Sequence, residues 1–341
     1  MNSKPIKRIL SSFSSLIPIE KLVSSNRHSL ILPFWHSVSD TPLPHLSQLY
    51  QVPTIKVFEQ TLDFFLLKYK PALADDVLKY SKTRIVPDKK LFFPSFDDGL
   101  SECYHVIAPI LKRKGVQAAF FINPSFVDNK MLFHRLKASL ILNHIKDRKF
   151  HSELWRKAEQ LLQDSTNTPL LPFLQKACFT DHPLLDQIAE VIDIDFATYL
   201  NKNQPYMTLQ QIKELQDEGF LIGAHGMDHR EFFLSSEDEI MQQIIESLEF
   251  LVRKINPPIN TFAFPFTDFK VPDSVFEKVN HAGLWDISFG TAGIKDETMR
   301  NHLQRIPMES DKLLKGKDLI RNEYMWYYLK SVIGKNKVSR W

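Results

Sequence analysis

Short apolar runs alternate with amphipathic helical segments along most of the chain, and this alternation restricts the fold more than any other feature. Seven runs have the length and composition of buried strands, at residues 29–35, 90–96, 116–122, 220–224, 260–266, 284–290 and 303–307. Strands that alternate with helices form parallel sheets, so the sequence predicts an α/β fold. Two arrangements remain open, an open doubly wound sheet and a closed barrel.

Several predicted helices carry their own boundary signals. Thr208 and Gln211 have the spacing of a capping box, and Ser236 and Glu239 repeat it. Helices are predicted over residues 54–69, 101–115, 208–219, 236–255 and 273–283.

Residues 123–205 interrupt the alternation with mostly helical patterns. This stretch is much longer than the roughly 10–12 residues that a strand-to-strand crossover needs. We therefore expect a single domain, residues 1–341, with a helical insertion over residues 123–205.

Composition excludes some classes of protein. The 43 basic and 40 acidic residues are too balanced for a nucleic-acid partner, which usually meets a concentrated basic face. No apolar run reaches the roughly 18 residues of a transmembrane helix. Residues 1–22 are basic and then apolar but lack a small-x-small cleavage site, which favours a helix docked on the domain over a signal peptide. We expect a cytoplasmic protein, with an envelope-associated one as the alternative.

Polar residues follow the predicted strands where each strand ends. Asp97 and Asp98 follow one strand, His225 follows another and His36 follows a third. In both candidate architectures, functional groups gather at the carboxyl ends of the strands. We therefore expect these side chains to share one site.

Two histidines in this group have the spacing of metal ligands. His225 and His229 are four residues apart, so on a helical turn both rings can bind one ion. Two histidines and a carboxylate leave coordination positions open, and this set favours zinc while allowing other divalent ions. One of Asp97 and Asp98 could bind the metal while the other stays free as a base. The alternatives are a solvated loop histidine and an acidic turn that caps the next helix.

Three motifs together resemble the NodB-type polysaccharide deacetylases of carbohydrate esterase family 4. The Thr-Phe-Asp-Asp-Gly motif of that family is matched by residues 95–99, and its His-Ser/Thr-x-x-His motif by residues 225–229. The aromatic-Pro-aromatic motif is matched within residues 262–269. The resemblance covers residues 90–122 and about 205–307, without the helical insertion.

The resemblance implies a distorted (β/α) barrel of about seven strands that removes N-acetyl groups from a carbohydrate. The implied ligands of a divalent metal, with zinc favoured, are Asp98, His225 and His229. Asp97 is the implied general base that activates metal-bound water. A backbone N–H near Phe266 is the implied donor to the oxyanion, and Pro265 and Phe266 shape the wall of the substrate groove.

The chain also departs from the family pattern. The third motif lacks the arginine that orients the base, and Arg305 at the last strand is the candidate replacement at the substrate-binding wall; the alternative is a surface or ion-pair residue. No late apolar-x-His motif is found. His36 is therefore interpreted as the acid, as in circularly permuted relatives, with a core histidine as the alternative. The acidic motif that tethers the acid is not recognisable, although Trp285 and Asp286 lie in the corresponding region.

Two other functions remain compatible with these motifs. The absence of the third-motif arginine and of the acidic motif that tethers the acid would be expected in a catalytically silent carbohydrate-binding homologue. The same residues could also hydrolyse another non-peptide C–N bond, such as that of a cyclic amide.

Overall fold

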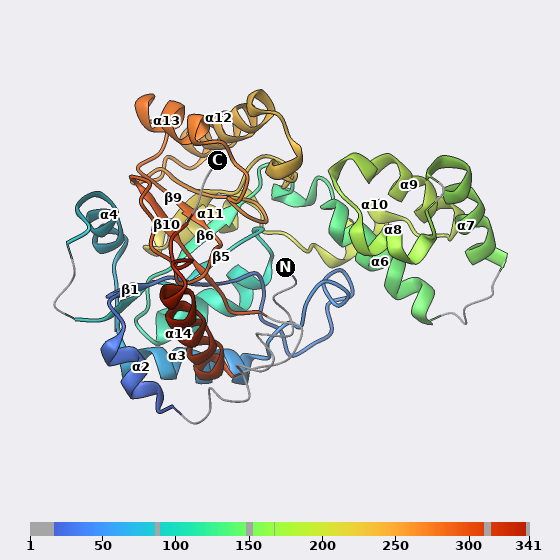
Figure 1. The fold of residues 1–341 in the computed structure, drawn as a ribbon. Coiled ribbons are helices and arrows are strands. Elements are labelled where there is room, and N and C mark those ends of the chain that lie inside the picture. Colours follow the sequence, from blue (N-terminus) through green and yellow to red (C-terminus); the bar gives the residue numbers. More distant parts are fainter. Residues whose placement is uncertain (1–16, 86–88, 148–152, 167, 310–314, 339–341) are drawn as a thin grey trace.

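A nearly closed barrel of parallel strands forms the centre of the molecule (Figure 1). The computed structural model describes residues 17–85, 89–147, 153–166, 168–309 and 315–338. Within these residues, eight strands pair in the order β10-β9-β8-β7-β6-β5-β2-β11, and every neighbouring pair is parallel. They are β2 (Pro33–Trp35), β5 (Ser95–Phe96), β6 (Ala119–Ile122), β7 (Leu221–Ala224), β8 (Thr261–Ala263), β9 (Ile287–Gly290), β10 (His302–Gln304) and β11 (Ile306–Pro307). The predicted distorted (β/α) barrel is confirmed.

The last predicted strand provides both edges of the sheet. Its first half, β10, pairs with β9, and its second half, β11, pairs with β2. Arg305 lies at the break between the two halves. Seven predicted segments therefore supply eight strands, and the barrel closes around this one segment. The open doubly wound sheet is excluded.

Two predicted strands are each divided into two short ones. Residues 29–35 form β1 (Leu30–Ile31) and then β2, and residues 90–96 form β4 (Leu91–Phe92) and then β5. β1 and β4 pair with β3 (Lys70–Pro71) in a separate sheet of order β1-β4-β3. Pro33 and Pro94 lie at or next to the two breaks. A proline has no N–H to donate, so the ladder is interrupted there.

The helices that follow the barrel strands begin where the sequence predicts. Both capping boxes are present, at the starts of α11 (Leu209–Asp217) and α12 (Glu237–Lys254). The predicted helix over residues 101–115 begins as a single π-helical segment, η1 (Cys103–Ile107), and continues as α5 (Ala108–Arg113). The other helices around the barrel are α2 (Ile19–Ser25), α3 (Ile55–Lys68), α4 (Ala74–Thr83), α13 (Asp273–His281), α14 (Gly316–Val332) and the short 3-10 turn η4 (Phe232–Leu234). Residues 1–16, most of the predicted N-terminal helix, lie outside the described residues.

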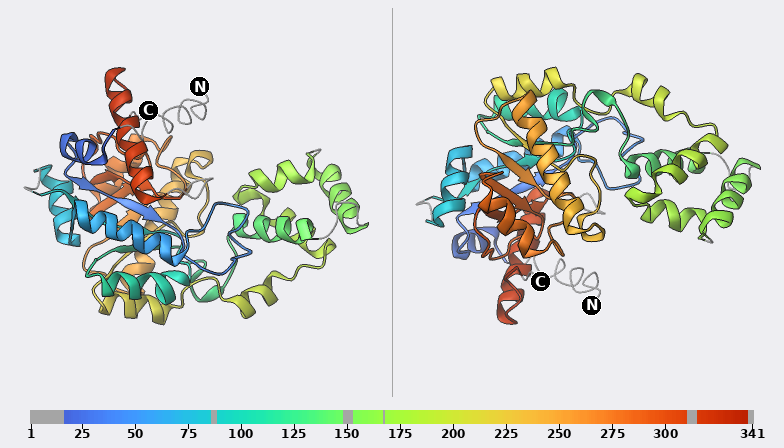
Figure 2. Two further views of the ribbon diagram at one scale, coloured as in Figure 1. Left: turned by 90° about the horizontal axis from the view of Figure 1, so that it is seen from below. Right: turned by 90° about the horizontal axis from the view of Figure 1, so that it is seen from above.

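A group of helices between β6 and β7 lies to one side of the barrel (Figures 1 and 2). We call this group, residues 123–205, the helical lobe. Its described helices are α6 (His134–Asp147), α7 (Glu153–Thr166), α8 (Leu170–Lys176), α9 (His182–Val191) and α10 (Phe196–Asn203), with 3-10 turns η2 (Val127–Asn129) and η3 (Phe179–Asp181). α6 to α9 enclose a hydrophobic core of their own, which includes Ile141, Leu162, Leu170, Leu185 and Ile188. The lobe is therefore held together by its own contacts as well as by its attachment to the barrel.

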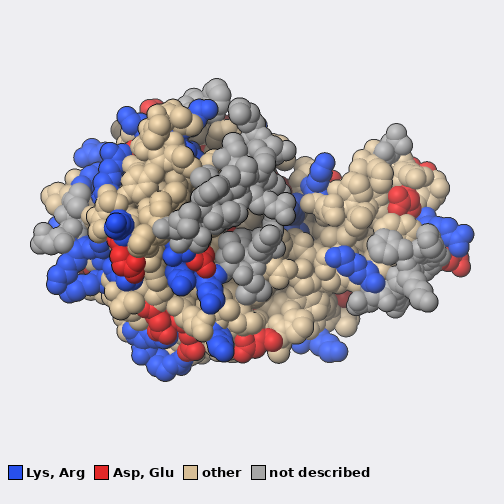
Figure 3. All heavy atoms as spheres, turned by 60° about the horizontal axis from the view of Figure 1, so that its bottom comes forward, with Lys and Arg blue, Asp and Glu red and all other residues tan. Residues whose placement is uncertain are grey.

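Charged side chains of both signs lie on the surface. On the face shown in Figure 3, Lys and Arg lie among Asp and Glu. No helix in the described part of the chain is both long and apolar enough to cross a membrane.

Candidate active site

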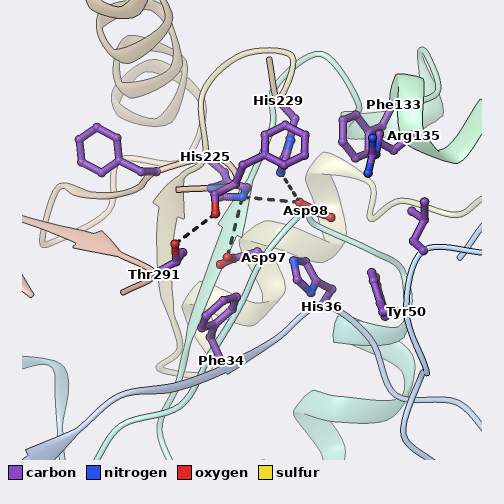
Figure 4. A pocket seen from close by; sticks show the side chains of 13 residues that line it. Phe34, His36, Tyr50, Asp97, Asp98, Phe133, Arg135, His225, His229 and Thr291 are labelled. Carbon is purple, nitrogen blue, oxygen red and sulfur yellow. Dashed lines mark hydrogen bonds and ion pairs between the residues drawn. The ribbon is translucent and has the colours of Figure 1, made fainter. Parts of the chain in front are cut away.

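The carboxyl ends of β5 and β7 bring four predicted site residues together (Figure 4). Asp97 and Asp98 follow β5, and His225 follows β7. The Nε2 atom of His229 lies 3.1 Å from Oδ1 of Asp98, and Nε2 of His225 lies 3.6 Å from the same oxygen. All four side chains are buried. The three predicted ligands each offer one donor atom, and these atoms lie within 4.8 Å of one another.

The backbone turns sharply to place these groups. Asp98 has φ +72° and Gly99 has φ +65°, so the chain leaves the strand in the left-handed region. A Cβ atom at Gly99 would lie 3.2 Å from Cγ2 of Ile122, which makes glycine the residue that fits this turn. His229 also has a positive φ, of +56°. Non-glycine residues in this region store strain, and such strain is common where side chains are held for function.

The three predicted ligands have the chemistry that a divalent cation needs. Oδ1 of Asp98 is buried and accepts no hydrogen bond from the described residues. Burial alone would raise the pKa of Asp98, but the neighbouring imidazole of His229 and the cation of His36 lower it, so the carboxylate stays ionised. The residues present therefore fit a metal ion.

The tautomer of one imidazole is also determined by the fold. Nδ1 of His225 lies 2.8 Å from the carbonyl oxygen of Ala263 and donates to it, so the lone pair lies on Nε2, which faces Asp98. Burial lowers the pKa of His225 to about 4, so the ring is neutral at pH 7. A neutral imidazole is the form that binds metal.

Arg305 holds the second carboxylate, Asp97. Its Nη1 and Nη2 atoms donate to the two oxygens of Asp97 at 2.7 and 2.8 Å, and Nη1 also donates to Oγ of Ser95 at 3.0 Å. Burial alone would raise the pKa of Asp97, but the charge and hydrogen bonds of Arg305 lower it, so the group is ionised. The Arg305 side chain is fully buried. It contacts the predicted base and is not one of the residues that line the cavity.

His36 reaches the same site from the end of β2 and is paired with a glutamate. Its Nδ1 hydrogen-bonds a carboxylate oxygen of Glu309, and its backbone N–H donates to the other at 2.8 Å. Burial lowers the pKa of His36, but the charge and hydrogen bond of Glu309 and the charges of Asp98 and Asp97 outweigh it and raise the pKa to about 10. The ring therefore carries a proton at neutral pH.

Sequence reasoning did not identify Glu309. It comes two residues after β11, so its position at a strand end was the available signal. Trp285 and Asp286 lie elsewhere. Trp285 packs in the core against Phe262, and Asp286 accepts the backbone N–H of Asn260.

A cavity of about 230 Å³ opens beside these groups. Of the predicted residues, those that line it are His36, Asp97, Asp98, His225, His229 and Phe266. The ring of Phe266 packs edge-on against His229, with the ring centroids 4.6 Å apart. Pro265 is buried and does not line the cavity. Lining residues that sequence reasoning missed include Phe34, Tyr50, Phe133, Arg135 and Thr291.

A family model described as polysaccharide deacetylase matches residues 84–163 and 182–285, which is more than half of the chain. The matched residues include parts of the helical lobe, which the three motifs alone did not cover. A search of curated proteins found no match to this sequence.

Solved structures with the same fold include several deacetylases. The deacetylase PplD of Streptococcus pyogenes, in complex with acetate, is 13% identical with a TM-score of 0.54, over 86% of this chain and 97% of that one. IcaB of Ammonifex degensii is 16% identical with a TM-score of 0.53, over 87% of this chain and 97% of that one. A polysaccharide deacetylase of Bacillus cereus is 12% identical with a TM-score of 0.52, over 86% of this chain and 68% of that one. At these identities the likeness shows a common fold.

Proposed function

Since this chain belongs to the polysaccharide deacetylase family, we propose that it is a metal-dependent hydrolase that removes N-acetyl groups from a carbohydrate. One observation carries the proposal. Asp98, His225 and His229 present converging donor atoms beside an ionised carboxylate, Asp97, and a protonated imidazole, His36. Hydrolysis of an amide needs a base for the water and an acid for the leaving amine, and both are present.

The metal would be held by Asp98, His225 and His229, and zinc suits this set of one oxygen and two nitrogen donors. When bound, a divalent ion polarises the acetamide carbonyl and lowers the pKa of a water molecule beside it.

Asp97 is the proposed general base. Its carboxylate accepts a proton from the attacking water, and the bidentate contact with Arg305 keeps both oxygens in place while it does so. The cation of Arg305 also makes Asp97 a weak base, because it lowers the pKa of the carboxyl. In this arrangement Arg305 acts through Asp97, as the missing third-motif arginine would, and makes no contact with the substrate.

His36 is the proposed general acid. It carries a proton at neutral pH and lines the cavity, so it can protonate the nitrogen of the leaving amine. Glu309 keeps the ring oriented through Nδ1, which leaves Nε2 to deliver the proton.

The oxyanion donor is proposed at Phe266. Its backbone has φ +55°, and its N–H has no acceptor among the described residues. A backbone N–H held by a rigid turn needs little reorganisation as charge develops on the carbonyl oxygen. Thr291 steadies this turn by donating its hydroxyl to the carbonyl oxygen of Phe266 at 3.1 Å.

Metal analysis coupled to acetate release tests this proposal. The purified protein is loaded in turn with zinc, cobalt and manganese, and acetate is measured with a panel of N-acetylated saccharides beside small linear and cyclic amides. We expect one ion per chain and acetate release from at least one saccharide. Hydrolysis of the cyclic amides alone would support the other C–N hydrolase. Saccharide binding without acetate release, with every metal, would support the catalytically silent homologue.

A further inference from the structure

A cationic side chain from the helical lobe lines the cavity beside the proposed metal ligands. Arg135, near the start of α6, is half-buried and lies on the side of the cavity away from Thr291 (Figure 4). The lobe therefore contributes directly to the wall of the site, and sequence reasoning assigned no function to this residue.

Arg135 has no carboxylate partner among the described residues. Its Nη1 donates to the carbonyl oxygen of Ala177 at 3.0 Å, which uses one of its five N–H donors. Among the acids, Glu231 has the largest effect on the pKa of Arg135, which it raises. Both carboxylate oxygens of Glu231, however, already have hydrogen-bond partners. Oε1 lies 3.0 Å from Nε2 of His134, and Oε2 accepts the backbone N–H of Phe179 at 3.1 Å.

The other charges at the site are each matched. Asp97 pairs with Arg305, and His36 pairs with Glu309. Asp98 would be offset by the proposed metal. Arg135 is thus the cation of the cavity wall that has no opposite charge in contact. Partial burial of an unpaired charge is unfavourable, and a bound anion would remove that cost.

A second donor without a partner lies on the same side of the cavity (Figure 4). The hydroxyl oxygen of Tyr50 is buried and forms no hydrogen bond with the described residues. Its ring is fixed by stacking on His36, with centroids 5.0 Å apart and an interplanar angle of 27°. A buried hydroxyl usually has a hydrogen-bond partner, so this one points to a group that a ligand supplies.

We propose that Arg135 and Tyr50 form an anion subsite, and that the substrate is an acidic carbohydrate whose carboxylate or phosphate binds there. This inference rests on the proposed deacetylase function, because the N-acetyl group would lie at the metal ligands of the same cavity. The planar guanidinium forms paired hydrogen bonds with carboxylate or phosphate oxygens, and Tyr50 adds one more. The cavity is smaller than the roughly 300–1,000 Å³ typical of small-molecule sites, so it would hold the reacting sugar and its nearest substituent.

Three N-acetylglucosamine tetrasaccharides test the subsite. The first is neutral, the second has N-acetylglucosamine units that alternate with glucuronic acid, and the third carries a terminal phosphate. The second and third therefore distinguish a carboxylate from a phosphate. We expect the wild-type protein to have a higher kcat/KM for at least one acidic substrate than for the neutral one. In Arg135→Gln the ratio of kcat/KM for the acidic substrate to kcat/KM for the neutral one should fall about 10- to 100-fold, which is a loss of about 1.4–2.8 kcal/mol. Arg135→Lys should lose less, and Tyr50→Phe less still.

Matched controls separate this effect from general damage. Arg156→Gln removes the same charge from an exposed position on α7 in the same lobe, and the ratio should stay at the wild-type value. Binding of the three saccharides is also measured by calorimetry in Asp97→Asn, with and without Arg135→Gln, so that turnover is not required.

The outcomes distinguish this inference from the function on which it rests. Equal kcat/KM and equal affinity for neutral and acidic saccharides, or the same loss for all three in Arg135→Gln, would overturn the anion subsite while leaving a deacetylase. Affinity for the acidic saccharides that depends on Arg135, without acetate release from any of them, would support the subsite and overturn the deacetylase.

Discussion

Two buried clusters of carboxylates and histidines lie in the barrel, and they look alike by ligand count. Each places three donor atoms within 4.8 Å of one another. The first is the proposed metal site, Asp98, His225 and His229. The second, which we call the sealed cluster, consists of Asp268, Glu297, His302 and the amide of Gln304.

The sealed cluster already has a group at its centre. Nε2 of Gln304 lies 2.7 Å from Oδ2 of Asp268 and 2.8 Å from Oε2 of Glu297, and donates to both. Oε1 of the same amide accepts the N–H of Ala292 at 2.7 Å, which determines how the amide is oriented. Nδ1 of His302 lies 2.8 Å from the hydroxyl of Ser288. The amide thus occupies the place that an ion would take.

The first cluster differs in two physical respects. One of its carboxylate oxygens, Oδ1 of Asp98, accepts no hydrogen bond from the described residues, and the cluster lines a cavity through which solvent can enter. The comparison teaches that an unfilled acceptor and an open side distinguish the proposed metal site from the sealed cluster, which the number of ligands does not. The sealed cluster instead holds the backbone at Thr291 in place, since Oδ1 of Asp268 accepts the N–H of Thr291 at 3.2 Å.

The largest expected effect comes from removing a ligand of the first cluster. Asp98→Ala or His229→Ala should abolish metal binding and lower kcat/KM by about a thousandfold or more, because the ion supplies several kcal/mol of transition-state stabilisation. Metal content by mass spectrometry and acetate release check both effects. His302→Gln, in the sealed cluster, should keep one ion per chain. Two ions per wild-type chain would contradict the distinction between the clusters.

Asp97→Asn separates the base from the ligands within the first cluster. We expect kcat to fall by about 10² to 10⁴, the usual contribution of a general base, with metal content unchanged. Asparagine can still accept a hydrogen bond from Arg305, so the fold should be retained, which circular dichroism checks. Activity near the wild-type level would remove Asp97 as the base.

Glu309→Gln tests the protonated imidazole beside the first cluster. Since Glu309 raises the pKa of His36 to about 10, its loss should lower that pKa by about one to three units. The alkaline limb of the kcat/KM profile should move to lower pH by the same amount. An unchanged limb in the pH–rate profile would argue against His36 as the acid.

The pair of His36 and Glu309 also makes the free energy of unfolding depend on pH, in a direction that can be predicted. The folded state holds the His36 proton more tightly than the unfolded chain, whose pKa is near 6.5. The stabilisation is therefore fully present below about pH 6.5 and is lost as pH rises through about 10. In urea titrations, the difference in free energy of unfolding between wild type and Glu309→Gln should therefore become smaller as the pH rises from about 6.5 to about 10.

The smallest catalytic effect is expected in the sealed cluster. Gln304→Ala removes the donor to two buried carboxylates and should lower the free energy of unfolding by about 1–3 kcal/mol. Its kcat should stay within a few-fold of wild type, because the metal ligands are untouched. Thermal unfolding and acetate release measure the two quantities. An unchanged stability would show that the amide does not hold this cluster together.

The features of the site that lie within short stretches of the chain could be predicted from the sequence. The apolar run before Asp97 and Asp98, the turn at Gly99 and the spacing of His225 and His229 all lie within short stretches, so pattern and motif identified them. The α/β class followed from the alternation of strands and helices for the same reason, while the barrel was implied by the resemblance of the three motifs to a known family. The division of two predicted strands at Pro33 and Pro94 could also have been predicted from the sequence, because a proline lacks the N–H that a strand donates at that position.

Contacts between distant residues were decided by the tertiary structure alone. Arg305 bonds Asp97 across 208 positions, and His36 bonds Glu309 across 273. Arg135 reaches the cavity from the lobe. Such pairs leave no periodicity or spacing in the chain, because closure of the barrel and packing of the lobe determine which side chains meet. The sequence by itself determined which groups can do the chemistry, and only the fold decided what charge each one faces.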